Sequence, residues 1–167
     1  MKKYAGGGKR ALPPEGREAV IKVAMALVRR GWTLRTGGAE GADEAFLLGA
    51  KRLHGGVEIY LPWKGYRGLQ GPVGVTPYTL KVASAHHEGW DRLSRGVQAL
   101  HARNVAVLLG PNGEDPVSFL VIWAPKEDGG SGHAIRVARG AGLPVFNLAH
   151  LGGLEALRAW IISREGP

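Results

Sequence analysis

The chain has 167 residues, 44% of them hydrophobic, and no cysteine. This length is sufficient for one packed domain and short for two, so we expect residues 1–167 to form a single domain. The absence of cysteine excludes disulfides and thiolate metal sites. No apolar run approaches the roughly 20 residues of a membrane helix, and no signal segment is visible. We therefore expect a cytoplasmic protein without a membrane span, with no metal site suggested by its scattered histidines.

Basic residues outnumber acidic ones by 22 to 14, which gives a formal net charge of +8. An excess of this size favours polyanionic partners, because lysine and arginine neutralise phosphates and release their counterions. The alternative is that the charge only keeps the protein soluble. The small number of Asn and Gln residues and the lack of Cys are typical of a heat-adapted source.

The first half of the chain alternates between short β-rich runs and helical periodicity. Residues 1–5 predict a first strand, and the apolar positions between Glu15 and Arg30 recur at helical spacing. A second strand is expected over Trp32 to Arg35, followed by a helix that starts near Ala42. Val57 to Leu61 predicts a third strand.

The second half continues this alternation. Helical spacing recurs in two segments, and the inward face expected for the second consists of Leu93, Val97 and Leu100, with Val105 as a further candidate. Residues 104–110 fit either a helix or a strand. The segments are helices over Tyr78 to His86 and Asp91 to His101, a buried strand over Phe119 to Trp123, a helix over Ala134 to Ala141, a strand over Pro144 to Leu148 and a closing helix through Leu154 and Ile161. This order predicts an α/β protein, with a Rossmann-like three-layer domain and a mainly parallel sheet.

Glycine clusters stand at three expected strand-to-helix junctions. They are Gly6-Gly7-Gly8 before Lys9-Arg10, Gly37-Gly38-Ala39, and Gly129-Gly130-Ser131-Gly132. In a parallel sheet all three junctions lie at the carboxyl edge, where open α/β sheets bind ligands. A glycine turn leaves the first N–H groups of the next helix unpaired, so the central junction predicts an anion-binding cradle. A tight turn without a ligand is the alternative for any one junction.

The ordered motifs resemble the superfamily that joins Smf/DprA DNA-processing proteins to Lonely Guy (LOG) proteins. The resemblance rests on Gly7 to Arg10, Gly37 to Asp43, Ala102 to Asn104, and Gly129 to Gly132 followed by Pro144-Val145-Phe146. It spans nearly the whole chain and is closest to small single-domain DprA-like proteins of phages and bacteria. Two positions depart from the usual pattern, with Lys9 before Arg10 and Thr36 in place of serine.

The resemblance implies one basic pocket that receives the phosphates of single-stranded DNA. Arginine suits this role through its bidentate geometry. Alternatives are surface ion pairs for the arginines, helix capping or arginine positioning for Asp43, and an N-cap for Ser131. The implied nucleotide- or phosphate-binding residues are Gly7, Gly8, Lys9, Arg10, Thr36, Gly37, Gly38, Gly41, Asp43, Arg103, Asn104, Gly129, Gly130, Ser131 and Gly132.

Aromatic and basic residues also gather in the segment from Pro62 to Pro77. Trp63 and Tyr66 are candidates for stacking on a base. The alternative is a surface loop in which Trp63 only covers the core.

LOG-type hydrolysis of nucleoside monophosphates is disfavoured. The LOG motif places a catalytic glutamate one turn into its helix, and the glycines align so that Arg136 takes that position and His133 that of a threonine. An arginine stays protonated, so it cannot act as a base. We therefore expect no catalytic residue and no cofactor.

The resemblance implies DNA processing and recombination, by a homodimer that binds single-stranded DNA and has a possible recombinase partner. A sensor or hydrolase that binds one mononucleotide or an ADP-ribose-like ligand is one alternative. A partner-binding module with a vestigial pocket is another.

Overall fold

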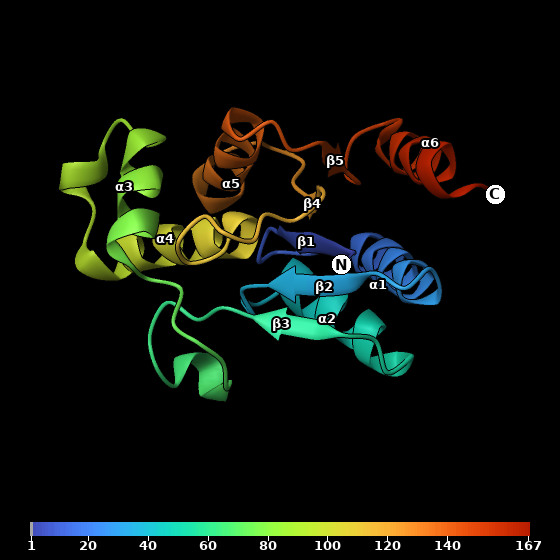
Figure 1. The fold of residues 1–167 in the computed structure, drawn as a ribbon, viewed down its shortest axis with the longest axis horizontal. Helices are drawn as coiled ribbons and strands as arrows, with labels where there is room; N and C mark the ends of the chain where they lie inside the picture. Colours follow the sequence, from blue (N-terminus) through green and yellow to red (C-terminus); the bar gives the residue numbers. More distant parts are fainter. Residues whose placement is uncertain (1) are drawn as a thin grey trace.

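A five-stranded parallel sheet organises the protein (Figure 1). The structure is a computed structural model that describes residues 2–167. The strand order is β3-β2-β1-β4-β5, and all four neighbouring pairs are parallel. The strands are β1 (Lys3–Gly8), β2 (Thr33–Thr36), β3 (Val57–Ile59), β4 (Leu120–Trp123) and β5 (Val145–Asn147).

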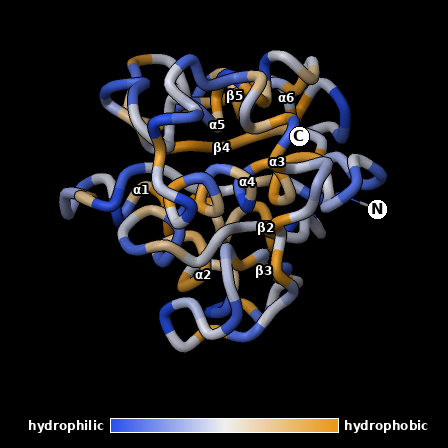
Figure 2. The backbone as a smooth tube through the Cα atoms, turned by 90° about the vertical axis from the view of Figure 1, so that its left-hand side faces the viewer, coloured by the Kyte–Doolittle hydropathy of each residue, from blue (hydrophilic) through white to orange (hydrophobic). Residues whose placement is uncertain are grey.

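Helices cover both faces of the sheet and form two separate apolar layers. On one face the core contains side chains of α1 (Pro14–Arg29), α2 (Ala42–Arg52) and α6 (Gly153–Glu165). On the other face it contains side chains of α3 (Pro77–Ala85), α4 (Arg95–Leu109) and α5 (Gly129–Gly140). Figure 2 shows hydrophobic colour on the inner strand β4 and hydrophilic colour on many of the outer loops. The predicted Rossmann-like three-layer architecture is confirmed, with a sheet that is parallel throughout.

The sequence periodicity explains how these elements bury their surfaces. In α1, Val20, Val23, Ala24 and Leu27 are buried on one face, and Pro13 precedes the first turn with an extended backbone. β4 has apolar residues at every position because both faces of a parallel sheet are covered. Within residues 2–167, no helix combines the length and the hydrophobicity needed to cross a bilayer.

Residues 104–110, for which the sequence allowed a helix or a strand, continue α4 to Leu109. Val105 and Leu108 are buried against the sheet at 0% and 1% exposure, so the apolar run serves a helix face. Gly110 follows in a left-handed conformation with φ 85° and ends the helix.

Two glycine clusters expected in loops lie inside regular elements. Gly6, Gly7 and Gly8 are the last residues of β1 and pair with β4. Glycine suits these positions because α2 packs closely against the end of the strand. A Cβ on Gly6 would lie 2.8 Å from the Phe46 ring, and one on Gly7 would lie 2.9 Å from Asp43 Oδ1. At the third junction α5 already begins at Gly129. These glycines therefore form the strand end and the first helical turn themselves.

Candidate functional site

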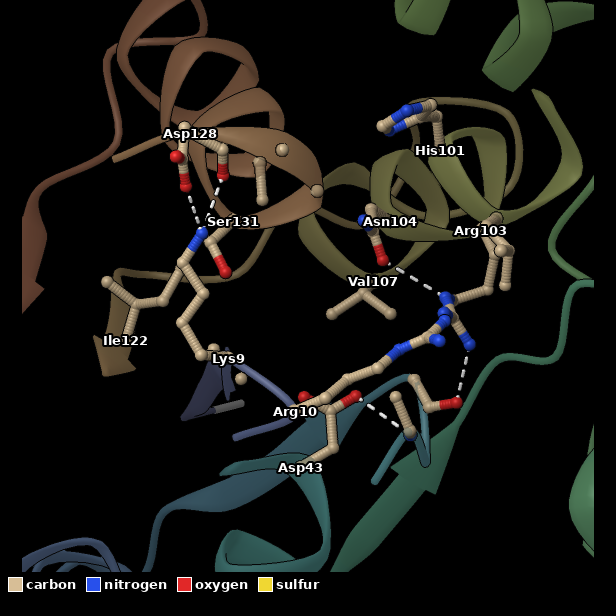
Figure 3. A pocket seen from close by; sticks show the side chains of 18 of the residues that line it. Lys9, Arg10, Asp43, His101, Arg103, Asn104, Val107, Ile122, Asp128 and Ser131 are labelled. Carbon is tan, nitrogen blue, oxygen red and sulfur yellow. Dashed lines mark hydrogen bonds and ion pairs between the residues drawn. The ribbon is translucent and has the colours of Figure 1, made fainter. Parts of the chain in front are cut away.

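The three glycine junctions and α4 surround one cavity of about 920 Å³ at the carboxyl edge of the sheet (Figure 3). In Figure 1 the arrowheads of β2 and β3 point toward α4, which marks this edge. The predicted site residues that line the cavity are Gly7, Gly8, Lys9, Arg10, Gly37, Asp43, Arg103, Asn104, Gly129, Gly130 and Ser131. Thr36, Gly38, Gly41, Gly132, Trp63 and Tyr66 do not line it.

Arg103 is held in one orientation on the cavity wall. It is 4% exposed, and its Nη1 donates to the Gly37 carbonyl at 2.6 Å while its Nε donates to Asn104 Oδ1 at 3.0 Å. The Tyr66 ring lies 5.4 Å from its guanidinium carbon. Among residues 2–167 no carboxylate lies within ion-pair distance of Arg103, so its charge is available to an anion.

Arg10 and Lys9 follow β1 and differ in what they contact. Arg10 is exposed, and within residues 2–167 its side chain makes no hydrogen bond or ion pair. Figure 3 shows it extending from the end of β1 along the cavity. The Lys9 ammonium instead bonds the Asp128 carboxylate and, at 2.9 Å, the Asp128 carbonyl. A phosphate at Lys9 would therefore have to compete with Asp128.

The predicted anion cradle at the start of α2 is partly occupied by the protein's own groups. The Ala39 N–H donates to Asp43 Oδ2 at 3.1 Å, the Gly41 N–H to Glu44 Oε1 at 3.0 Å, and the Ala42 N–H to the Lys9 carbonyl at 3.1 Å. These three N–H groups are therefore not free for a ligand, whereas the N–H groups of Asp43 and Glu44, in the first turn of α2, have no acceptor within residues 2–167. The turn closes around the Asp43 carboxylate, which accepts from Ala39 ahead of the helix and so does not cap α2.

Asp43 is 8% exposed, and burial raises the pKa of its carboxyl group. The nearby charge of Arg103 and the Ala39 N–H act in the opposite direction on the same pKa. Asp43 thus supports the turn beneath Arg103 and adds a partly compensating negative charge behind it.

The first turn of α5 has three N–H groups without an acceptor. Its N-cap residue Asp128 makes no side-chain capping bond, and the Gly132 N–H is the first to bond back, to the Asp128 carbonyl at 2.9 Å. The N–H groups of Gly129, Gly130 and Ser131 have no acceptor within residues 2–167. Together with the helix dipole, these donors favour an anion at the cavity's α5 side.

An apolar wall completes the cavity, and it lies where the sequence predicted core. Leu93, Val97 and Leu100 line the cavity, and Val97 is 38% exposed. Val97 and Leu100 share a face of α4 with His101, Asn104 and Val107, and Leu93 lies just before this helix, so one face carries both apolar and polar lining residues. The expected inward core face is therefore wrong for Leu93, Val97 and Leu100, whereas Val105 is buried in the core. The 3.6-residue period indicates a shared face but not what that face contacts.

Two buried histidines lie between α4 and α5, and one of them, His101, also lines the cavity. The rings of His101 and His133 are 4.3 Å apart, and the Nδ1 atom of each is buried without a hydrogen-bond partner. Burial lowers the pKa of both to about 4, assisted by neighbouring charges. Both rings are therefore neutral near pH 7. Among residues 2–167 no group of three metal-ligating side chains is placed to hold a metal ion.

The two LOG-motif positions face away from the site. His133 is 0% exposed and its Nε2 lies 2.9 Å from the Ala83 carbonyl oxygen. Arg136 donates to the His86 carbonyl at 3.1 Å. Neither residue lines the cavity, so neither is placed to act there in the role of the LOG glutamate.

The two candidate stacking residues lie outside the cavity. Tyr66 is 8% exposed beneath the Arg103 guanidinium, and Trp63 is 44% exposed with its ring 5.4 Å from that of Tyr66. Tyr66 therefore packs behind the Arg103 guanidinium and supports it.

Comparison with protein-family models finds no match, and comparison with curated proteins finds none either. Several solved structures match in fold, including the three that follow. DNA processing protein A from Helicobacter pylori, described by its single-stranded DNA binding, is 18% identical with a TM-score of 0.54, over 95% of this chain and 72% of that one. The Moco carrier protein of Chlamydomonas rheinhardtii is 19% identical with a TM-score of 0.53, over 99% of this chain and 86% of that protein.

DprA from Streptococcus pneumoniae is 18% identical with a TM-score of 0.56, over 98% of this chain and 56% of that protein. The present chain therefore spans little more than half the length of that protein. At 18% to 19% identity these structures show a shared fold: the chain has the same Rossmann-like fold as the two DprA proteins and the Moco carrier protein.

Proposed function

We propose that the protein binds single-stranded DNA, or another nucleotide-containing polyanion, in the carboxyl-edge cavity and acts in DNA processing or recombination. One observation carries the proposal. Two guanidinium groups, Arg10 and Arg103, face the same cavity as the open N-terminus of α5, and within residues 2–167 neither arginine has an ion-pair partner. Each of these groups attracts phosphate, and together they can contact neighbouring phosphates of one strand.

The apolar wall supports a nucleotide in preference to inorganic phosphate. Leu93, Val97 and Leu100 lie on the α4 side of the cavity, next to Arg103 and Asn104. A nucleotide has a charged phosphate and a planar base, so a cavity with cationic and apolar sides can receive both. The single-stranded DNA binding described for the H. pylori protein agrees with this ligand class. The homodimer and the recombinase partner remain predictions.

A small nucleotide-like ligand is the second candidate. The Moco carrier protein shares the fold, and the cavity of about 920 Å³ has the size typical of small-molecule sites. A single ligand would fill the cavity without contacts beyond it, so its affinity would not depend on strand length.

Fluorescence anisotropy with labelled oligonucleotides of several lengths, at two salt concentrations, tests the proposal. Strand binding predicts an affinity that rises with length and falls steeply with salt. The double variant Arg10→Gln/Arg103→Gln should lose at least tenfold in affinity, on the order of 1.4 kcal/mol. A matched double variant, Lys51→Gln/Arg52→Gln, removes the same charge from exposed positions at the end of α2.

Equal losses in both double variants would refute the assignment of the cavity as the binding site. An affinity independent of length, combined with tight binding of a mononucleotide, would replace strand binding by the small-ligand candidate.

A further inference from the structure

A second hollow adjoins the first, and Arg10 lines both. It has a volume of about 540 Å³ and lies between α1, the start of α2 and the 3-10 turn η1 (Tyr66–Gly68). Arg17 and Arg67 contribute from α1 and η1, so three arginines from three segments surround it. Arg10 and Gly41 belong to the motifs of the first site and Arg67 to the segment from Pro62 to Pro77, so Arg17 is the arginine of this hollow to which no motif pointed.

The acidic residues of the hollow are partly neutralised from within. Glu44 accepts from Arg67 Nη2 at 3.1 Å and from the Gly41 N–H at 3.0 Å. Both bonds lower the pKa of its carboxyl group, and the Gly41 bond has the larger effect. Arg67 also donates to the Gly38 carbonyl at 2.7 Å. Glu44 and Arg67 therefore compensate each other, and they form a fixed rim.

The hollow has three arginines, Arg10, Arg17 and Arg67, against the two carboxylates of Glu40 and Glu44. Arg10 and Arg17 are exposed, and within residues 2–167 neither side chain makes a hydrogen bond or ion pair. The hollow therefore keeps a net positive charge that the protein itself does not compensate, and an anion is the ligand that this charge favours.

The two cavities are joined at Arg10, whose backbone is fixed. The Lys9 carbonyl accepts from the Ala42 N–H at 3.1 Å. Gly41 has no room for a side chain, because a Cβ there would meet the Lys9 and Arg10 carbonyl oxygens. The chain after β1 is thus held against the start of α2, and Arg10 stands on the ridge between the two cavities.

We propose that this hollow is a second phosphate subsite, which receives the same strand after it has crossed Arg10. The inference rests on the proposed function, because it assumes a ligand longer than one nucleotide in the first cavity. Arg17 is the residue that distinguishes the second subsite. A basic groove that follows a phosphate backbone is the usual way in which proteins hold single strands.

Anisotropy titrations of Arg17→Gln against a thymidine dinucleotide and an oligomer of roughly ten nucleotides test the subsite. We expect the oligomer to lose about fivefold in affinity, with a salt slope reduced by about one unit, and the dinucleotide to bind as it does to the wild type. Arg29→Gln is the matched control, since Arg29 is exposed at the other end of α1 and its loss changes the net charge equally.

Three results would overturn the second subsite: an equal loss in Arg29→Gln, an equal loss for the dinucleotide, or no loss for the oligomer. These results would not contradict the assignment of the first cavity as a binding site, because the wild-type protein still binds the oligomer in each case. Failure of the wild type to bind any oligomer would instead refute the proposed function, and the subsite with it.

Discussion

At the scale of single residues, the site depends on how Gly37 and Arg103 fit together. Gly37 has no left-handed backbone, so its conformation does not require glycine, but a Cβ there would lie 2.7 Å from the Arg103 guanidinium carbon. The absence of a side chain at Gly37 therefore allows Arg103 to lie flat against the turn and bond its carbonyl. A glycine that the sequence assigned to an anion cradle positions a cation instead.

Gly37→Ala should consequently separate binding from stability. The added methyl group displaces the flexible end of Arg103, so we expect oligonucleotide affinity to fall about tenfold and the free energy of unfolding to change by less than ~1 kcal/mol. Gly8→Ala is the contrasting variant, because Gly8 has φ 147° and its Cβ would meet the Trp123 backbone. It should lose about 1–3 kcal/mol of stability. Denaturant unfolding combined with anisotropy checks both, and similar stability losses in the two would contradict this account.

At the scale of elements, the packing of α4 on α5 places two titratable rings in the interior. His101 and His133 have pKa values lowered to about 4, below the ordinary histidine value, by burial. Between about pH 6.5 and 4 the unfolded chain therefore binds more protons than the folded one, and folding stability falls as the pH falls through this window. Burial of Asp43 raises its pKa and has the opposite sign, so a comparison of variants is needed to isolate the histidines.

His101→Leu should flatten the dependence of stability on pH. Loss of one buried histidine removes up to about 1.4 kcal/mol per pH unit from the slope between pH 6 and 5. Chemical denaturation at several pH values measures that slope. His54→Asn, at an exposed position with a left-handed backbone that asparagine tolerates, is the control and should retain the wild-type slope. An unchanged slope in His101→Leu would show that this ring does not titrate on unfolding.

At the scale of the whole molecule, the parallel sheet brings distant segments to one edge. The cavity is lined from Gly6 at the end of β1 to Ala134 in α5, with α4 between them in the chain. All strands point the same way, so the strand ends and the helix starts that follow them meet at the same side. A ligand in the cavity therefore bridges elements that separate when the protein unfolds.

Ligand binding should accordingly raise the melting temperature of the whole fold. An oligonucleotide at 100 times its dissociation constant adds about 2.7 kcal/mol, which corresponds to roughly 5–10 °C for a chain of this size. Differential scanning fluorimetry measures the shift. The Arg10→Gln/Arg103→Gln variant should show little shift at the same ligand concentration, and a shift equal to that of the wild type would place the ligand elsewhere.

The sequence alone determined the order of the elements and the places where the chain passes from strand to helix. Apolar periodicity in α1 and the uncharged run of β4 report burial directly, because each element must cover one or both faces. The glycine clusters and the Arg-Asn pair marked the segments that form the cavity, and the resemblance assigned them phosphate. Lys9, Arg10 and Arg103 all line the cavity.

Only the tertiary structure decided which groups are available to a ligand. The N–H groups of Ala39, Gly41 and Ala42 at the start of α2 are taken by Asp43, Glu44 and the Lys9 carbonyl, while the first three of α5 are not taken. Likewise the spacing of Leu93, Val97 and Leu100 predicted a shared face but not that the face borders a cavity. Such outcomes depend on contacts between residues far apart in the chain, as between Gly37 and Arg103, and local residue patterns carry no information about those distances.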